Sequence, residues 1–101
     1  MAAVPKKLYA NKPSTGNTTL YTVPANTKTI IKNILICNTS ALAAIITVSA
    51  AGQNIISGMR VDPNDTVSMD ISLVMETSDT LTASQGTSGA ISLYVSGVEV
   101  A

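Results

Sequence analysis

Residues 66–73 read TVSMDISL, an unbroken alternation of polar and apolar side chains. The apolar members run from Val67 to Leu73 on odd numbers, and the even positions hold threonine, serine or aspartate. Successive side chains of a β-strand point to opposite faces of a sheet, so this period of two predicts a strand with one buried face. Residues 91–96, ISLYVS, repeat the pattern near the end of the chain.

Two further segments are rich in β-branched residues and predict longer strands. Residues 27–38 carry isoleucines on both parities, which is typical of a central strand covered on both faces. The β-branched run at residues 45–48 favours a strand over 42–49, although the alanines at its start would also suit a helix. Shorter strands are expected at residues 8–10, 18–23, 53–57 and 80–84.

Turn-forming Pro, Gly, Asn and Asp residues separate these segments, and 101 residues suffice for one domain. We therefore predict an all-β fold, a single antiparallel β-sandwich or jelly-roll domain of about eight short strands. Residues 8–101 are expected to form this sandwich. Residues 1–7, with Pro5 and two lysines, are expected to be a flexible N-terminal arm that orders on a neighbouring subunit.

The composition argues against most catalytic and metal-binding functions. Hydrophobic residues make up 46% and aromatic residues 3% of the chain, with no Phe, Trp or His, so the core must be aliphatic. Without histidine, the commonest general base and the commonest nitrogen ligand of zinc are both missing. No nucleophile motif and no phosphate-binding glycine loop occurs. We expect no enzyme activity, no catalytic, cofactor-binding or metal-ligating residue, and no cofactor.

One acidic loop and the single cysteine are candidates for a metal site and for a nucleophile, respectively. Asp62, Asn64 and Asp65 offer oxygen ligands for Ca²⁺, but the loop lacks the twelve-residue calcium pattern, and Pro63 favours a plain β-turn. Cys37 lies in an isoleucine-rich strand and is expected to be a small buried hydrophobe rather than a nucleophile.

The remaining candidates are carboxylates and tyrosines. A glycosidase needs two carboxylates that flank its substrate, and Glu76 and Asp79 are close in sequence, but no aromatic residue is near them to stack a sugar. Tyr9, Tyr21 and Tyr94 are expected to cap the core with their hydroxyl groups at its rim, rather than to form a ligand site.

The chain carries no sign of a membrane or a secreted location. The single cysteine excludes an intramolecular disulfide, and no apolar run follows Lys6 and Lys7 as a signal peptide would require. The most apolar stretch, residues 41–51, is about half the length of a membrane span. Six basic residues balance six acidic ones, which argues against nucleic acid as a partner.

The charges are nevertheless segregated along the chain. Five lysines precede every acidic residue, and all the acidic residues follow Arg60. Two interpretations stay open: the charges pair across neighbouring strands of one chain, or basic and acidic edges of different subunits meet.

Residues 20–34, LYTVPANTKTIIKNI, continue to CNTS at 37–40, and a Pro-Asn turn follows at 62–65. The later elements are the alternating strand 67–73, the turn SDTL at 78–81 and SGVEV at 96–100. Together they resemble small β-sandwich virion proteins of tailed bacteriophages, over most of the chain from Leu8 onward. The family pattern usually has glycine before the aspartate of the later turn, where this chain has Ser78.

The resemblance implies a structural role in the virion, with the protein made in the bacterial host cytoplasm. It implies a capsid decoration or head-associated subunit that forms homo-oligomers and binds other virion proteins, such as a major capsid, tail or neck protein. The alternatives are a neck, tail or fibre component, or a module that binds a host-surface carbohydrate or receptor. No catalytic residue is carried over, because the family pattern contains none.

Overall fold

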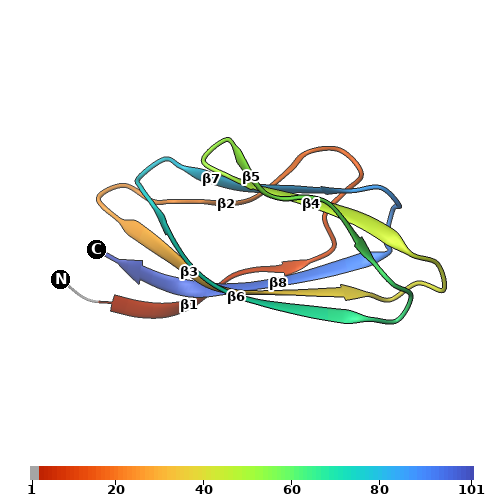
Figure 1. The fold of residues 1–101 in the computed structure, drawn as a ribbon. Coiled ribbons are helices and arrows are strands. Elements are labelled where there is room, and N and C mark those ends of the chain that lie inside the picture. The colour runs from red at the N-terminus through yellow and green to blue at the C-terminus, as the bar shows by residue number, and fades with distance from the viewer. Residues whose placement is uncertain (1–2) are drawn as a thin grey trace.

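The computed structural model describes residues 3–101 and confirms the predicted fold class. Eight antiparallel strands form two sheets that face each other as a sandwich (Figure 1), and the described residues contain no helix that could cross a membrane. The strands are β1 (Ala3–Asn11), β2 (Thr18–Thr22), β3 (Lys28–Asn38), β4 (Ala44–Ala50), β5 (Gln53–Val61), β6 (Thr66–Met75), β7 (Thr80–Gln85) and β8 (Ile91–Val100). Each segment expected to be a strand is one.

The strand order shows how the chain is wound. One sheet, sheet A, has the order β1-β8-β3-β6, and the other, sheet B, has the order β2-β7-β4-β5. The first strand therefore pairs with the last, the third with the sixth, the second with the seventh and the fourth with the fifth. As a result, β6 and β5 are edge strands of their sheets, and so are β1 and β2.

The core is aliphatic, as the composition predicts. It takes the inward side chains of both sheets, which alternate with outward ones along each strand. The largest fully buried side chains are Ile31, Ile34, Ile36, Ile46, Met75, Leu81, Ile91, Leu93, Val23, Val48, Val61 and Val95.

Two buried polar side chains organise the loops at the strand ends. Asn38 is fully buried: its amide nitrogen donates to the carbonyl oxygens of Leu42 (2.8 Å) and Val61 (3.0 Å), and its oxygen accepts from Ser40. Gln85 exchanges two hydrogen bonds with the backbone of Ile91: its amide nitrogen donates to the carbonyl oxygen at 3.1 Å, and its oxygen accepts from the backbone nitrogen at 2.8 Å. The nitrogen and the oxygen of the Asn38 amide group therefore both have hydrogen-bond partners in nearby residues of the same chain.

The predicted turns contain residues with left-handed backbone geometry. Asn26 has φ 55°, Asn64 has φ 57° and Ser78 has φ 74°. Asparagine tolerates this conformation better than most residues, whereas for serine it is unusual. A left-handed position at Ser78 gives a physical reason for glycine to stand there in the virion proteins that the sequence resembles.

Gly97 lies on β8 opposite Ile31 of β3, at a close approach of the two strands. A Cβ atom on Gly97 would be 2.3 Å from the carbonyl oxygen of Ile30 and 3.1 Å from Cδ1 of Leu8. Beside this point, the pairing of β3 with both its neighbours shifts register between Ile31 and Asn33. The close backbone approach has room only for glycine.

The structure corrects the expected arm over residues 3–7. These residues form the first half of β1 and pair with residues 96–100 of β8, from Ala3 opposite Val100 to Lys7 opposite Ser96. The reason is that β8 continues past Gly97 to Val100 and presents a pairing edge along its full length. Met1 and Ala2 lie outside the described residues.

Candidate interaction surface

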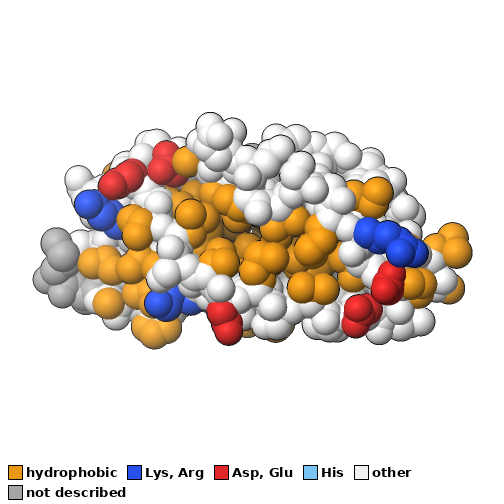
Figure 2. Space-filling model, in the orientation of Figure 1, with side chains coloured by type: hydrophobic (Ala, Val, Ile, Leu, Met, Phe, Trp, Pro, Cys, Tyr) orange, Lys and Arg blue, Asp and Glu red, His pale blue; other side chains and the backbone are white. Residues whose placement is uncertain are grey.

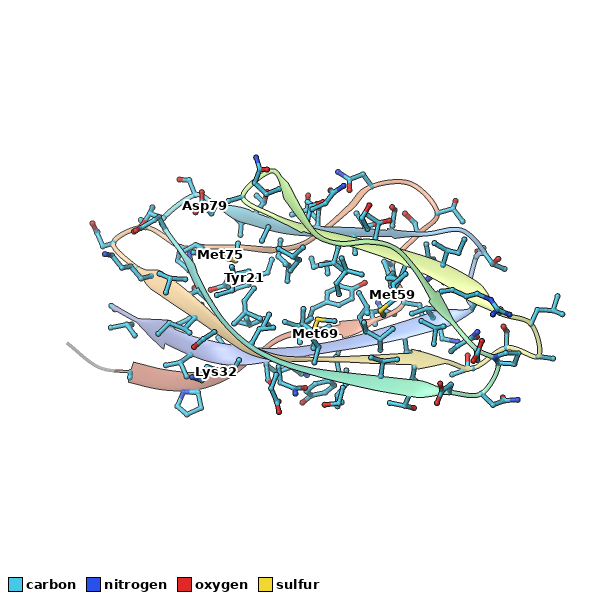
Figure 3. The ribbon with its side chains drawn as sticks, viewed as in Figure 1. Tyr21, Lys32, Met59, Met69, Met75 and Asp79 are labelled. Carbon is cyan, nitrogen blue, oxygen red and sulfur yellow. The ribbon has the colours of Figure 1, made fainter. Side chains whose placement is uncertain are left out.

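One side of the sandwich is open between the edge strands β5 and β6. Figure 2 shows a band of hydrophobic side chains running along the molecule between the two sheets. Its members are only half-buried although they face the core: Ile55 and Met59 on β5, and Val67, Met69, Ile71 and Leu73 on β6. Figure 3 shows Met59 and Met69 in the space between the sheets. We call this set the open-side row.

The open-side row differs from the covered core in one respect. Inward residues of the central strands, such as Ile34 and Ile46, are fully buried, because strands flank them on both sides. Residues of β5 and β6 have a neighbouring strand on one side only. The alternation in residues 66–73 was correctly interpreted as a strand, but its apolar face is half covered rather than buried.

Sequence reasoning missed the second half of β5, which contributes Met59 to this surface. The predicted strand ended at residue 57, whereas β5 continues through Gly58 to Val61. The signal was present, since Met59 and Val61 resume an apolar alternation after the glycine. Gly58, with φ 57°, bends the backbone there without ending the strand.

The charged residues confirm in part the pairing expected within one chain. Lys6 Nζ lies 3.3 Å from Glu99 Oε1, which joins the neighbouring strands β1 and β8. Lys28 Nζ lies 3.6 Å from Glu76 Oε2, between exposed side chains. The second interpretation, contact between edges of different subunits, stays a prediction.

Tyr21 ties the two sheets together at the end of the sandwich that holds both termini. Its hydroxyl group, which reaches over from sheet B, donates to the Glu99 carboxylate and lies 2.8 Å from Thr29 Oγ1 in sheet A. Burial and the bond to Glu99 raise the pKa of Tyr21 to about 12. The same hydrogen bond, with help from Lys6, lowers the pKa of Glu99. Tyr21 thus fits its predicted role at the core rim.

We expect the Tyr21→Phe variant to lose about 1 kcal/mol of unfolding free energy near neutral pH. Since the pKa of Glu99 is lowered, its contribution is complete above its ordinary value of 4.5 and vanishes as the pH falls through the lowered pKa. Since the pKa of Tyr21 is raised, its contribution is complete below 10.0 and vanishes as the pH rises through about 12. Thermal unfolding followed by circular dichroism should show the largest difference from wild type between these limits. Tyr94→Phe, at an exposed ring on the outer face of sheet A, is the control, and a pH-independent difference for Tyr21→Phe would contradict the assignment.

The acidic residues considered for metal or sugar chemistry make local contacts. The Asp62 carboxylate pairs with Arg60 at 3.3 Å, and the Asp65 carboxylate accepts from the backbone nitrogen of Thr66 at 2.9 Å. Asp79 accepts from the backbone nitrogen of Glu76 at 2.9 Å. These are contacts of turns, and residues 3–101 contain no cluster of three or more His, Cys, Asp or Glu side chains placed to hold a metal ion.

Two sequence interpretations are corrected on the outer face of sheet A. Cys37 is half-buried rather than fully buried. Side chains alternate along β3, so the side chain of Ile36 points into the core and that of Cys37 points away from it. Tyr94 is 46% exposed on the same face, so it does not cap the core. It stands between two shallow grooves of about 460 and 470 Å³, the first of which also contains Lys7 and Lys32.

Comparisons with known proteins give a likeness of fold. No protein-family model and no curated protein matches the chain. One similar solved structure is the C-terminal domain of EclA, a sugar-binding protein, with a TM-score of 0.47 and 15% identity over 98% of this chain and 77% of that one. Another is a pentameric capsid protein from metagenomic phage sequences, with a TM-score of 0.40 and 19% identity over 96% of this chain and 59% of that one. Neither likeness carries an argument about function.

Proposed function

We propose that this chain is a structural protein of a bacteriophage virion, a capsid decoration or head-associated subunit that binds copies of itself and other virion proteins. The observation that carries the proposal is the open-side row. Six aliphatic or thioether side chains that face the core are only half-buried between β5 and β6. A contiguous exposed apolar surface on a small domain is typical of a protein-protein contact.

The winding of the chain adds fold-level support. Pairing of the first strand with the last and of the fourth with the fifth, in two four-stranded sheets, is the order of a jelly roll. This architecture occurs in viral capsid and in lectin domains. Since one fold serves many functions, the strand order supports a virion role by analogy of fold.

The residues that carry the resemblance to phage virion proteins support the same role. They form turns and strands, and Ser78 adopts the left-handed geometry that glycine would provide at that turn. Such residues maintain a scaffold and offer no reactive group.

The test is whether the chain belongs to assembled particles. Particles of the phage that encodes it are separated on a density gradient and washed with high salt, and the fractions are examined by mass spectrometry. We expect the chain to co-migrate with the particles in a fixed ratio to the capsid protein. Recovery only among free proteins at the top of the gradient would contradict the proposal.

A host-surface carbohydrate-binding module is the second candidate, and the exposed Tyr94 beside Lys32 favours it. An exposed aromatic ring is the platform on which a sugar ring stacks. If the chain is absent from particles but is retained on host cell-wall glycans, and Tyr94→Ala abolishes retention, this candidate replaces the virion role.

A further inference from the structure

The two free edges of sheet A carry opposite charges. One edge is β1, which contains Lys6 and Lys7 and is followed by Lys12, with no acidic residue among residues 3–12. The other edge is β6, which contains Asp70 and no basic residue, and which lies between Asp65 and Glu76. Each edge has a strand on one side only, so its outer backbone groups are free to meet another chain.

We propose that copies of this chain associate through these unlike edges, with β6 of one copy lying along β1 of the next. The inference deepens the proposed function, on whose self-assembly it rests, by naming the two surfaces that meet. The partner is a second copy because one molecule presents both complementary surfaces.

The register within sheet A aligns the opposing charges. Lys7 lies opposite Ser96, Ser96 opposite Asn33, and Asn33 opposite Asp70. These residues form a single row across the sheet, with a cation at one end and an anion at the other. If the next copy continues the sheet in register, its Lys7 lies beside Asp70 of the first.

The direction of the strands is compatible with such a contact. Every neighbouring pair in sheet A is antiparallel, so β1 and β6 run in opposite directions. A rotation axis parallel to the strands keeps the direction of each strand in every copy. Copies around that axis therefore bring β6 against β1 as an antiparallel pair, and a repeated contact between unlike surfaces closes as a ring.

Contacts between like edges are disfavoured. Two β6 edges would bring acidic side chains together, and two β1 edges would bring lysines together. Charge on the β6 edge thus selects a β1 edge as its partner.

The same contact covers the open-side row. β5 and β6 border one side of the sandwich, and β1 and β2 border the other. A neighbour that places its β1 edge along β6 brings its own flank over Met59 and Met69. Charge sets the register of this contact, and the apolar row supplies contact area.

The experiment measures association of the purified chain by sedimentation velocity over a concentration series at low and high salt. We expect the wild-type chain to form a closed oligomer that weakens with salt. Lys7→Glu and Asp70→Lys are each expected to weaken association about tenfold, and the double variant to restore it. Lys32→Glu reverses an exposed lysine on the central strand β3 and is the matched control, expected to change little.

Three results would overturn the inference. The first is a wild-type chain that stays monomeric throughout the series. The second is association that neither single reversal alters. The third is strengthening by Asp70→Lys without any effect of Lys7→Glu, which indicates a two-fold pairing of β6 edges. Circular dichroism of each variant confirms folding, and if Asp70→Lys does not fold, Lys7→Glu with Lys7→Gln as its neutral counterpart decides the result.

Failure of this inference is distinguishable from failure of the proposed function. A chain that co-migrates with particles but shows no charge-dependent self-association keeps the virion role and loses the edge contact. A chain that self-associates as described but is absent from particles keeps the edge contact and loses the virion role.

Discussion

The Gly97→Ala variant is expected to lose about 3 kcal/mol of unfolding free energy, a larger loss than most single substitutions cause. The added Cβ atom would lie 2.3 Å from the carbonyl oxygen of Ile30, a distance that requires the backbone of β8 or β3 to move. Both strands are central to sheet A, so the shift would disturb pairing along the whole sheet. Chemical denaturation in urea, followed by circular dichroism, measures the loss directly.

Gly16→Ala is the matched control for this effect. A Cβ atom on Gly16 would meet only Ser14 Oγ, at 3.9 Å, in ordinary van der Waals contact. The unfolding free energy of the control is expected to stay within about 0.5 kcal/mol of the wild-type value, as is usual for surface substitutions. Equal stability of Gly97→Ala and Gly16→Ala would show that β8 and β3 can separate at this point without cost.

The second large effect is expected at Asn38, where Asn38→Asp should cost about 4 kcal/mol at neutral pH. The amide nitrogen donates to the carbonyl oxygens of Leu42 and Val61 in a site with no exposure to solvent. Aspartate replaces that donor by an anionic oxygen that faces two acceptors. The loss should shrink as the pH falls, because a protonated carboxyl group can again donate to one of the carbonyls.

Asn54→Asp is the matched control, because it makes the same substitution at an exposed position where no carbonyl acceptor within residues 3–101 faces the new carboxylate. Asn54 is exposed, and its side-chain oxygen accepts a hydrogen bond from the hydroxyl group of Ser49, which a carboxylate oxygen can equally accept. Its stability should stay within about 0.5 kcal/mol of wild type. Denaturation curves of both variants across the acid range give the comparison, and a pH-independent loss at Asn38→Asp would contradict the account.

Strand positions were predictable from the sequence because they depend on local patterns. Alternation in residues 66–73 and 91–96, β-branched runs in 27–38 and 45–48, and Pro-Asn or Asp turns together located all eight strands. The left-handed residues Asn26 and Asn64 occur in turns that the sequence marks with proline and asparagine. The short range of these signals explains their success.

The arrangement of the strands was less predictable, because it depends on which face each strand presents and on what covers it. In β3, apolar residues occupy both parities, so the sequence did not decide that Ile36 points inward and Cys37 outward. Alternation in β6 is the same whether its apolar face is buried or half covered. The start of β1 at Ala3 depends on the distant strand β8, which no pattern within residues 3–7 indicates.

The candidate surface was predicted only in part. Segregation of lysines and acidic residues along the chain is visible in the sequence, and it led to two interpretations that the sequence could not separate. The strand order converts that segregation into two oppositely charged edges of one sheet, because β1 and β6 lie at its two ends. The open-side row depends on the edge positions of β5 and β6, which no local pattern reveals.

The pairing of β1 with β8 also bears on how the protein is made in the cell. During translation, β1 is synthesised before β8 and has no strand partner until β8 has been made. The third and fourth strands can pair earlier with β6 and β5, but their second neighbours, β8 and β7, are also made later. Closure of sheet A therefore comes late in the synthesis of these strands, and until then the apolar residues of β1 and β3 lack β8 as a neighbouring strand. A chaperone that shields nascent β-strands would have its largest effect on yield in that interval.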